Sequence, residues 1–255
     1  MLKAALKRPS FLFGGAVVYI GASTVTYLTL YKPKTADDFL LQLDNAKRRH
    51  IFNENAVKYD KAIDLDEKLM GISLMRRYLL RSCSENVLEV AAGTGRNLGY
   101  YPRSVKQLTL IDFSDGMVEQ LKKKYEFEQI VSTMDQCDCH VMRAEELQFP
   151  DQSFDTVIDT FGLCSMDDAK SALREMQRVC RKDGKILLLE HGQSHYKWLS
   201  SLLDKFAGVH AKAWGCQWNR DILALVRDAE LEIEDIKRFH FGTTYYIVAR
   251  PTRMI

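Results

Sequence analysis

Glu89-Val-Ala-Ala-Gly-Thr-Gly-Arg-Asn97 and the later Thr109-Leu-Ile-Asp112 are the two stretches that decide the fold. Residues 87–90 are apolar apart from Glu89 and stop at small residues, a pattern typical of a buried parallel strand that turns into a loop. Gly93 and Gly95 allow a bound molecule to approach the backbone closely, because glycine has no Cβ and accepts positive φ. We therefore expect a nucleotide-type cofactor at this loop.

A second strand is predicted at residues 105–111, and it ends in Asp112. In doubly wound α/β folds an acid at this point hydrogen-bonds ribose hydroxyls, whose two donors one carboxylate can accept. A dinucleotide site favours a third glycine, in G-x-G-x-x-G, at the position that Leu98 occupies here. Glu89 would repel a pyrophosphate, but it could help to hold an amino-acid ammonium, directly or through water.

At these residues the sequence resembles the class I S-adenosylmethionine-dependent methyltransferases, whose first motif is E/D-x-G-x-G-x-G, with Ala91 at the family's first glycine. Residues 51–60, Ile-Phe-Asn-Glu-Asn-Ala-Val-Lys-Tyr-Asp, are similar to the F-D-x-x-A-x-x-Y-D segment that folds over the cofactor in many small-molecule methyltransferases. The resemblance implies that Tyr59 reaches the methionine end of the ligand. A ring that only packs on its own helix is the competing interpretation.

Residues 139–159 resemble a second stretch of the family, G-D-A-E-x-L-P-F-x-D-x-S-F-D, which forms a third strand, an adenine-contacting turn and a fourth strand. Ala144 and Glu145 match this pattern, whereas Arg143 replaces the acid that accepts from the adenine amine in relatives. Adenine contact is therefore expected from backbone amides or Glu145. The predicted cofactor-binding residues are Tyr59, Glu89, Ala91, Gly93, Gly95, Asp112, Phe113, Met117, Ala144, Glu145 and Thr160.

The predicted acceptor side lies at the ends of the fourth strand, at residues 154–160, and of the fifth strand, at residues 185–192. A predicted helix that starts at Met166 and a turn at 181–184 connect these two strands. Polar groups at the carboxyl end of a strand can orient an acceptor or take its proton, so His191 is the candidate catalytic residue, with a structural histidine as the alternative. The aromatic stretch at 197–218 is expected to cover the acceptor pocket. Alternation over 231–250 predicts a terminal hairpin.

The bulk composition excludes some partners. The chain has 255 residues and a formal net charge of +2, which is too balanced to indicate a nucleic-acid surface. The six cysteines are predicted to be reduced, and no metal is expected, because the closely spaced Cys137 and Cys139 lack a second ligand pair.

Residues 1–36 contain no acidic side chain, and basic residues bracket an uncharged stretch at 9–31. As a helix these 23 residues would span about 34 Å, which is enough for a bilayer core of roughly 30 Å. We expect a single membrane anchor here, with a removed presequence or an interfacial helix as alternatives. The acid-free, basic start also resembles a mitochondrial import signal.

These patterns predict a doubly wound, mostly parallel, seven-stranded α/β sheet with an N-terminal transmembrane helix. The expected divisions are a basic N-terminus and anchor at 1–34, a helical linker and cofactor-covering segment at 35–74, and a methyltransferase domain at 75–255. The whole resembles the Oms-type mitochondrial inner-membrane methyltransferases and the membrane-bound methyltransferase-like thiol methyltransferases.

The resemblance implies an S-adenosylmethionine-dependent enzyme that methylates a small-molecule, lipid or thiol acceptor. The expected location is the mitochondrial inner membrane, with the endoplasmic reticulum membrane as the alternative, and the sequence leaves the oligomeric state open. Two other functions remain. One is a non-catalytic, cofactor-binding assembly factor of the inner membrane. The other is an NAD-type oxidoreductase, which Leu98 and the terminal hairpin disfavour.

Overall fold

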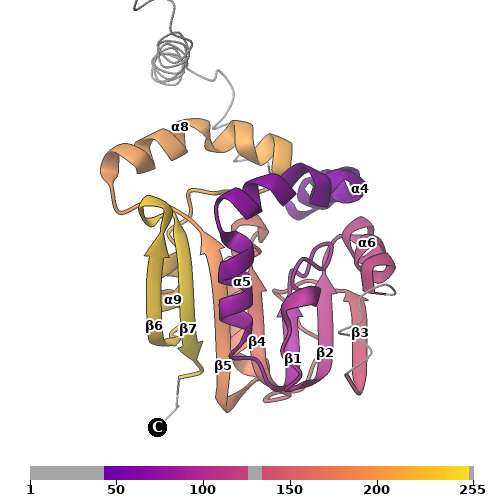
Figure 1. Cartoon of the computed structure of the whole chain (residues 1–255). Coiled ribbons are helices and arrows are strands. Elements are labelled where there is room, and N and C mark those ends of the chain that lie inside the picture. Colours follow the sequence, from indigo (N-terminus) through magenta and orange to yellow (C-terminus); the bar gives the residue numbers. More distant parts are fainter. Residues whose placement is uncertain (1–42, 126–133, 253–255) are drawn as a thin grey trace, which may run out of the picture.

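The computed structural model describes residues 43–125 and 134–252. Its centre is one seven-stranded sheet with the strand order β3-β2-β1-β4-β5-β7-β6 (Figure 1). The first five strands in this order are parallel, and β7 runs antiparallel to both of its neighbours. The predicted mostly parallel sheet and its closing hairpin are therefore confirmed.

The strands that carry the expected motifs occupy the middle of the sheet. β1 (Glu85–Val90) pairs with β2 (Val105–Asp112) and with β4 (Phe154–Thr160), so the ends of these three strands meet at one edge. β2 pairs on its other side with β3 (Gln136–Val141). The antiparallel end of the sheet consists of β6 (Glu232–Phe239) and β7 (Thr244–Arg250).

Helices cover both faces of the sheet, and each face has its own apolar core. On one face α7 (Ala169–Val179) packs against β4 and β5, and α9 (Ile222–Asp228) packs against α7; the two helices bury Leu173, Met176 and Val226. On the other face α5 (Ile72–Leu80) and α6 (Asp115–Tyr125) bury Leu79, Leu80 and Leu121. Because both faces are covered, most side chains of β1 and β4 are buried, whichever face they point to.

Two long helices lie across the carboxyl ends of the central strands: α4 (Asn45–Leu69) and α8 (Lys197–Trp214) (Figure 1). α4 begins at Asp44, whose side chain accepts a hydrogen bond from the Lys47 backbone amide at 2.9 Å. α8 ends at Gly215, which has a left-handed φ of 72°. The two helices place side chains from both halves of the chain above one edge of the sheet.

The structure changes one expected boundary. The turn predicted at residues 181–184 is part of β5 (Cys180–His191), because Cys180 already pairs with Phe154 before an irregularity shifts the register.

The proposed anchor at residues 9–31 lies outside the described residues. Within residues 43–125 and 134–252, no helix combines the length and apolar character that crossing a bilayer requires.

Candidate functional site

A cavity of about 390 Å³ lies at the carboxyl ends of β1, β2, β4 and β5, beneath α4 and α8. This is the edge at which open α/β sheets bind their ligands, and the size falls in the range of small-molecule sites. Its apolar wall includes Phe52, Ile63, Phe161 and Trp214, and its polar groups include Asp112 and Arg76. The cavity is thus a mostly apolar pocket with a few fixed charges.

The loop after β1 forms one wall of the cavity, and three of its residues have positive φ. Gly93 (φ 57°) has open space where a Cβ would stand, so its backbone is accessible to a ligand. Gly95 (φ 78°) does not line the cavity: a Cβ there would lie 2.4 Å from Leu121 Cδ1, so this glycine is required for packing. Ala91 lines the cavity with φ 51°, a left-handed conformation that costs a non-glycine residue about 1–2 kcal/mol.

Asp112 lies at the tip of β2, faces the cavity and is nearly buried. Its Oδ2 accepts a hydrogen bond from the Gly93 amide and its Oδ1 accepts one from the Ser114 amide, each at 2.9 Å. These two bonds fix the carboxylate and leave each oxygen with a further lone pair. Burial raises the pKa of Asp112 to about 6.

Glu89 does not line the cavity, although it lies on the strand that leads to it. The side chain is 1% exposed, and its carboxylate accepts hydrogen bonds from the Tyr101 hydroxyl and, at 2.9 Å, from Asn97 Nδ2. Burial raises its pKa to about 7. The carboxylate that was expected to hold an ammonium is therefore occupied by Asn97 and Tyr101 and does not line the cavity.

Arg76 on α5 is a cavity residue that the sequence reasoning missed. Its Nη1 donates to Thr160 Oγ1 at 2.7 Å and to Asn97 Oδ1 at 3.1 Å, and its Nη2 donates to Glu67 Oε1 at 2.8 Å. Arg76 is buried, and its Nε has no hydrogen-bond partner. It therefore brings a permanent positive charge to the cavity, and its Nε–H is a donor without a partner among the described residues.

A smaller recess opens beside the main cavity and shares Ala91, Phe113 and Gly162 with its wall. Ala144 and Glu145 line this recess rather than the main cavity. Glu145 Oε1 is buried and has no hydrogen-bond partner, while Oε2 lies 3.5 Å from Nε of the half-exposed Arg143. The recess thus contains an unused acceptor of the kind that an exocyclic amine requires.

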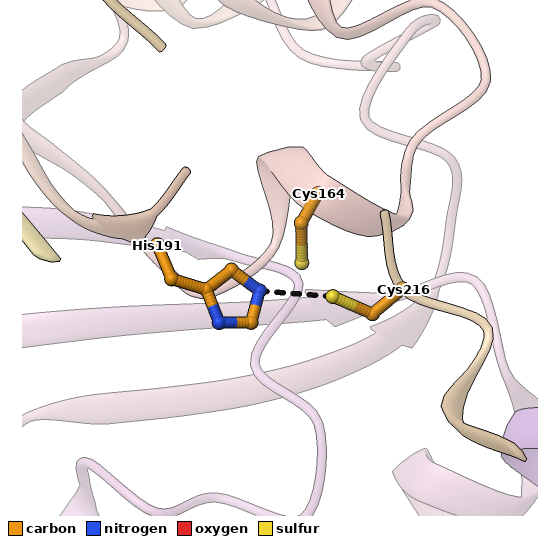
Figure 2. Close-up of side chains that lie close together, drawn as sticks. All are labelled: Cys164, His191 and Cys216. Atoms are coloured by element: carbon orange, nitrogen blue, oxygen red, sulfur yellow. Dashed lines mark hydrogen bonds between the residues drawn. The ribbon is translucent and has the colours of Figure 1, made fainter. Parts of the chain in front are cut away.

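The opposite wall is formed by the ends of β4 and β5 and by the C-terminal end of α8. His191 lines the cavity, and its Nε2 lies 2.9 Å from Cys216 Sγ, with Cys164 beside both (Figure 2). Tyr59 from α4 packs edge-on against Trp214, with ring centroids 6.1 Å apart. This wall therefore combines aromatic rings with one imidazole and two thiols.

The structure brings most of the sequence-predicted site residues together. Eight of them line the main cavity: Tyr59, Ala91, Gly93, Asp112, Phe113, Met117, Thr160 and His191. Ala144 and Glu145 line the adjoining recess, and Glu89 and Gly95 line neither of the two. Arg76, Cys164 and Cys216 also line the main cavity without having been singled out.

The comparisons with known proteins agree with this geometry. Residues 88–188 match the family model described as "Methyltransferase domain". The chain is 35% identical over 214 residues to "Methyltransferase OMS1, mitochondrial" of Saccharomyces cerevisiae, an alignment that covers 79% of this chain and 45% of that protein. It is 31% identical over 166 residues to the ubiquinone/menaquinone biosynthesis C-methyltransferase UbiE of an Enterobacter species, covering 62% of this chain and 64% of UbiE.

Solved structures share the fold. A SAM-dependent methyltransferase of Leishmania major superposes with a TM-score of 0.60 at 12% identity, covering 80% of this chain and 82% of that one. The geranyl diphosphate C-methyltransferase of Streptomyces coelicolor was solved with Mg²⁺, geranyl diphosphate and S-adenosyl-L-homocysteine. It superposes with a TM-score of 0.55 at 12% identity, covering 71% of this chain and 77% of that one. Sheet order, site position and sequence matches together place this chain among the class I S-adenosylmethionine-dependent methyltransferases.

Proposed function

We propose that this protein transfers the methyl group of S-adenosylmethionine to a small-molecule, lipid or thiol acceptor. The observation that carries the proposal is the cavity itself, which exposes Gly93 and Asp112 on one wall and His191 on the other. A sulfonium methyl is already an activated electrophile, so the protein mainly has to align the donor and the acceptor and exclude water. Well-oriented groups can reach effective molarities of about 10⁵ M or more.

The charges in the cavity suggest how the cofactor lies. Asp112 would accept the ribose hydroxyls, and the recess with Glu145 would take the adenine amine. Arg76 would pair with the methionine carboxylate, because it is buried, carries a fixed charge and keeps Nε without a partner. Glu67 Oε1, held 2.8 Å from Arg76 Nη2, is then a better candidate for the ammonium than the enclosed Glu89.

The acceptor would enter between α8 and the tip of the hairpin. Trp214 and His210 from α8 line this part of the cavity, together with His240 in the hairpin turn and Thr244 at the start of β7. His191 would orient the acceptor or take its proton.

The proposed location is the mitochondrial inner membrane, to which the protein would be anchored. The yeast relative is named as mitochondrial, and the basic residues near the start of the sequence support this proposal.

Two measurements test the proposal together. Calorimetric titration with S-adenosylmethionine is expected to show one binding site per chain. Incubation of the full chain with methyl-labelled cofactor and mitochondrial membrane extract is expected to release S-adenosylhomocysteine and to label an extracted acceptor. Binding of the cofactor without any transfer would instead favour the non-catalytic assembly factor, and no binding at all would refute both functions.

A further inference from the structure

Cys164, His191 and Cys216 form a compact group of sulfur and nitrogen atoms in the cavity wall (Figure 2). Cys164 Sγ, His191 Nε2 and Cys216 Sγ all lie within 4.8 Å of one another. We propose that this cluster binds a sulfur-preferring divalent cation, for which zinc is the natural candidate, and leaves a fourth coordination position open to the cofactor cavity.

The geometry is close to that of a zinc site. Bond lengths of about 2.3 Å to sulfur and about 2.0 Å to nitrogen place the ligand atoms of a tetrahedral site roughly 3.6–3.8 Å apart. His191 Nε2 and Cys216 Sγ, now 2.9 Å apart, would therefore separate by about 0.7 Å on binding. A shift of this size is within the reach of side-chain rotation.

The donor set also indicates which metal would bind. Thiolate and imidazole ligands suit zinc, whereas Mg²⁺ prefers oxygen ligands. Two cysteines and one histidine are a donor set of catalytic zinc sites, in which the fourth position is left to water or substrate. All six cysteines are free, so neither thiol of the cluster is consumed by a disulfide. Among residues 43–125 and 134–252, this is the one group that brings three such ligands together.

The three ligands come from segments that are bonded to one another. Cys164 lies in the short 3-10 turn Leu163–Ser165 after β4, His191 ends β5, and Cys216 follows α8. The Gln217 amide donates to the Cys164 carbonyl at 2.9 Å, which joins the two cysteine segments directly. This bond joins backbone atoms and uses none of the three ligand atoms, so it can hold the two cysteine segments together while the side chains bind a cation.

Two further contacts hold the same segments in place. Arg220 donates from Nη1 to the Leu163 carbonyl at 3.0 Å and from Nη2 to the Met166 carbonyl at 2.6 Å. The Arg220 carbonyl in turn accepts from the Gln193 amide at 2.9 Å, two residues after His191. One arginine thus connects all three ligand-bearing segments.

The neighbours of the cluster suit metal ligands. Ser165 Oγ lies 3.4 Å from Cys164 Sγ, where its hydroxyl can donate to a thiolate. The Phe161 ring packs edge-on against the His191 imidazole, with centroids 5.4 Å apart, and so restricts the ring's orientation. Such outer contacts orient the ligands and tune the bound metal.

The role of the site rests on the proposed methyl transfer, whereas metal binding itself does not. An acceptor thiol or hydroxyl bound at the fourth position would lose its proton to solvent, because a bound cation lowers the pKa of its ligands. The acceptor's lone pair then forms the bond to the methyl carbon. The bond from that carbon to the sulfonium breaks, and its electron pair stays on sulfur as the thioether of S-adenosylhomocysteine.

The test uses the full chain, stripped of metal with a chelator and kept reduced. Titration with Zn²⁺ against a competing chelator is expected to give one ion per chain, and Co²⁺ is expected to give thiolate charge-transfer bands. Cys164→Ser and Cys216→Ser should each weaken Zn²⁺ binding by more than the roughly 10–100-fold that follows loss of an outer contact. Cys180→Ser is the matched control, because Cys180 is as deeply buried as Cys164 but lies outside the cluster.

A second measurement needs no variant. Zn²⁺ is expected to protect Cys164 and Cys216 of the wild-type chain from alkylation, read residue by residue by mass spectrometry. Three results would overturn the proposal. They are no Zn²⁺ uptake by the wild-type chain, Zn²⁺ uptake that both cluster variants retain, and a disulfide between the two thiols in place of metal binding. Cofactor titration of the same samples keeps the two proposals apart, because a chain that binds S-adenosylmethionine but takes up no Zn²⁺ refutes only the metal site.

Discussion

Replacing Asp112 with asparagine tests the proposed ribose contact while the shape of the side chain is preserved. The carboxylate is held by the amides of Gly93 and Ser114, each at 2.9 Å, and it faces the cavity. Two ribose hydroxyls can donate to its remaining lone pairs. Asparagine keeps one acceptor oxygen and presents an NH₂ group where the other stood, so we expect one of these two contacts to be lost.

The expected loss is large for binding and small for folding. A hydrogen bond to a charged group contributes about 1.5–3 kcal/mol, so the dissociation constant for S-adenosylmethionine should rise roughly 10- to 100-fold. In the folded chain the ionised carboxylate costs about 3 kcal/mol at pH 7.5, because burial raises its pKa from 3.8 to about 6. The amide removes this cost but leaves one backbone N–H without an acceptor, which costs about 1–3 kcal/mol, so the two effects nearly cancel.

Calorimetry at pH 7.5 and pH 5.5 provides the assay, with Asp183→Asn, an exposed aspartate distant from the cavity, as the control. The wild-type carboxylate takes up a proton as the pH falls through about 6, so wild-type affinity should fall between these two values. The affinity of Asp112→Asn should change little with pH. Equal affinities of variant and wild type at pH 7.5, with both chains folded, would refute the assignment of Asp112 to the ribose.

Three further predictions concern the surrounding groups. Arg76→Lys keeps the charge but loses the guanidinium, whose two Nη atoms bond Glu67 and Thr160, so cofactor affinity should fall about 10-fold or more. The control is Arg77→Lys, on the exposed face of the same helix, which should leave cofactor affinity unchanged. Glu145→Ala should weaken S-adenosylhomocysteine binding by about 1.5–3 kcal/mol if the free oxygen of Glu145 holds the adenine amine. As an internal check, the variant and the wild type should bind an analogue that lacks this amine with equal affinity. Burial, together with the nearby Cys164 and Glu89, raises the pKa of Asp159, so wild-type stability falls as pH rises above about 4. Asp159→Asn should be about 1–3 kcal/mol more stable than wild type at pH 8 and equal to it at pH 4 in chemical denaturation, and a constant difference would contradict this.

The strands and the cofactor edge were predictable because local patterns specify them. The apolar run of β1, the acid at the end of β2 and the alternation of the terminal hairpin each depend on neighbouring residues. β5 began earlier than expected because Cys180 pairs with Phe154, a residue 26 positions away. Charged residues after a helix are typical of a turn, and only this pairing makes them part of a strand.

The site was less predictable, because orientation depends on tertiary contacts. Nothing local to Glu89 shows that Asn97 and Tyr101 enclose its carboxylate. Arg76 looks like a surface residue beside Arg77, yet α5 turns it inward to pair with Glu67. Ligand spacing was no better a guide to Cys164, His191 and Cys216, which are separated by 27 and 25 residues, far more than in a compact zinc motif.

The position of α4 has a consequence for turnover. It lies over the cavity, and ion pairs fasten it to α6: Arg49 with Asp115 at 2.6 Å and Asp60 with Lys124 at 2.5 Å. Gly71, with a left-handed φ of 69°, separates this lid from α5 and is a natural hinge. We predict that spent cofactor leaves past α4 when these two ion pairs break. Added salt, which screens such surface charges, should then speed product release and raise the catalytic rate wherever release is the slow step.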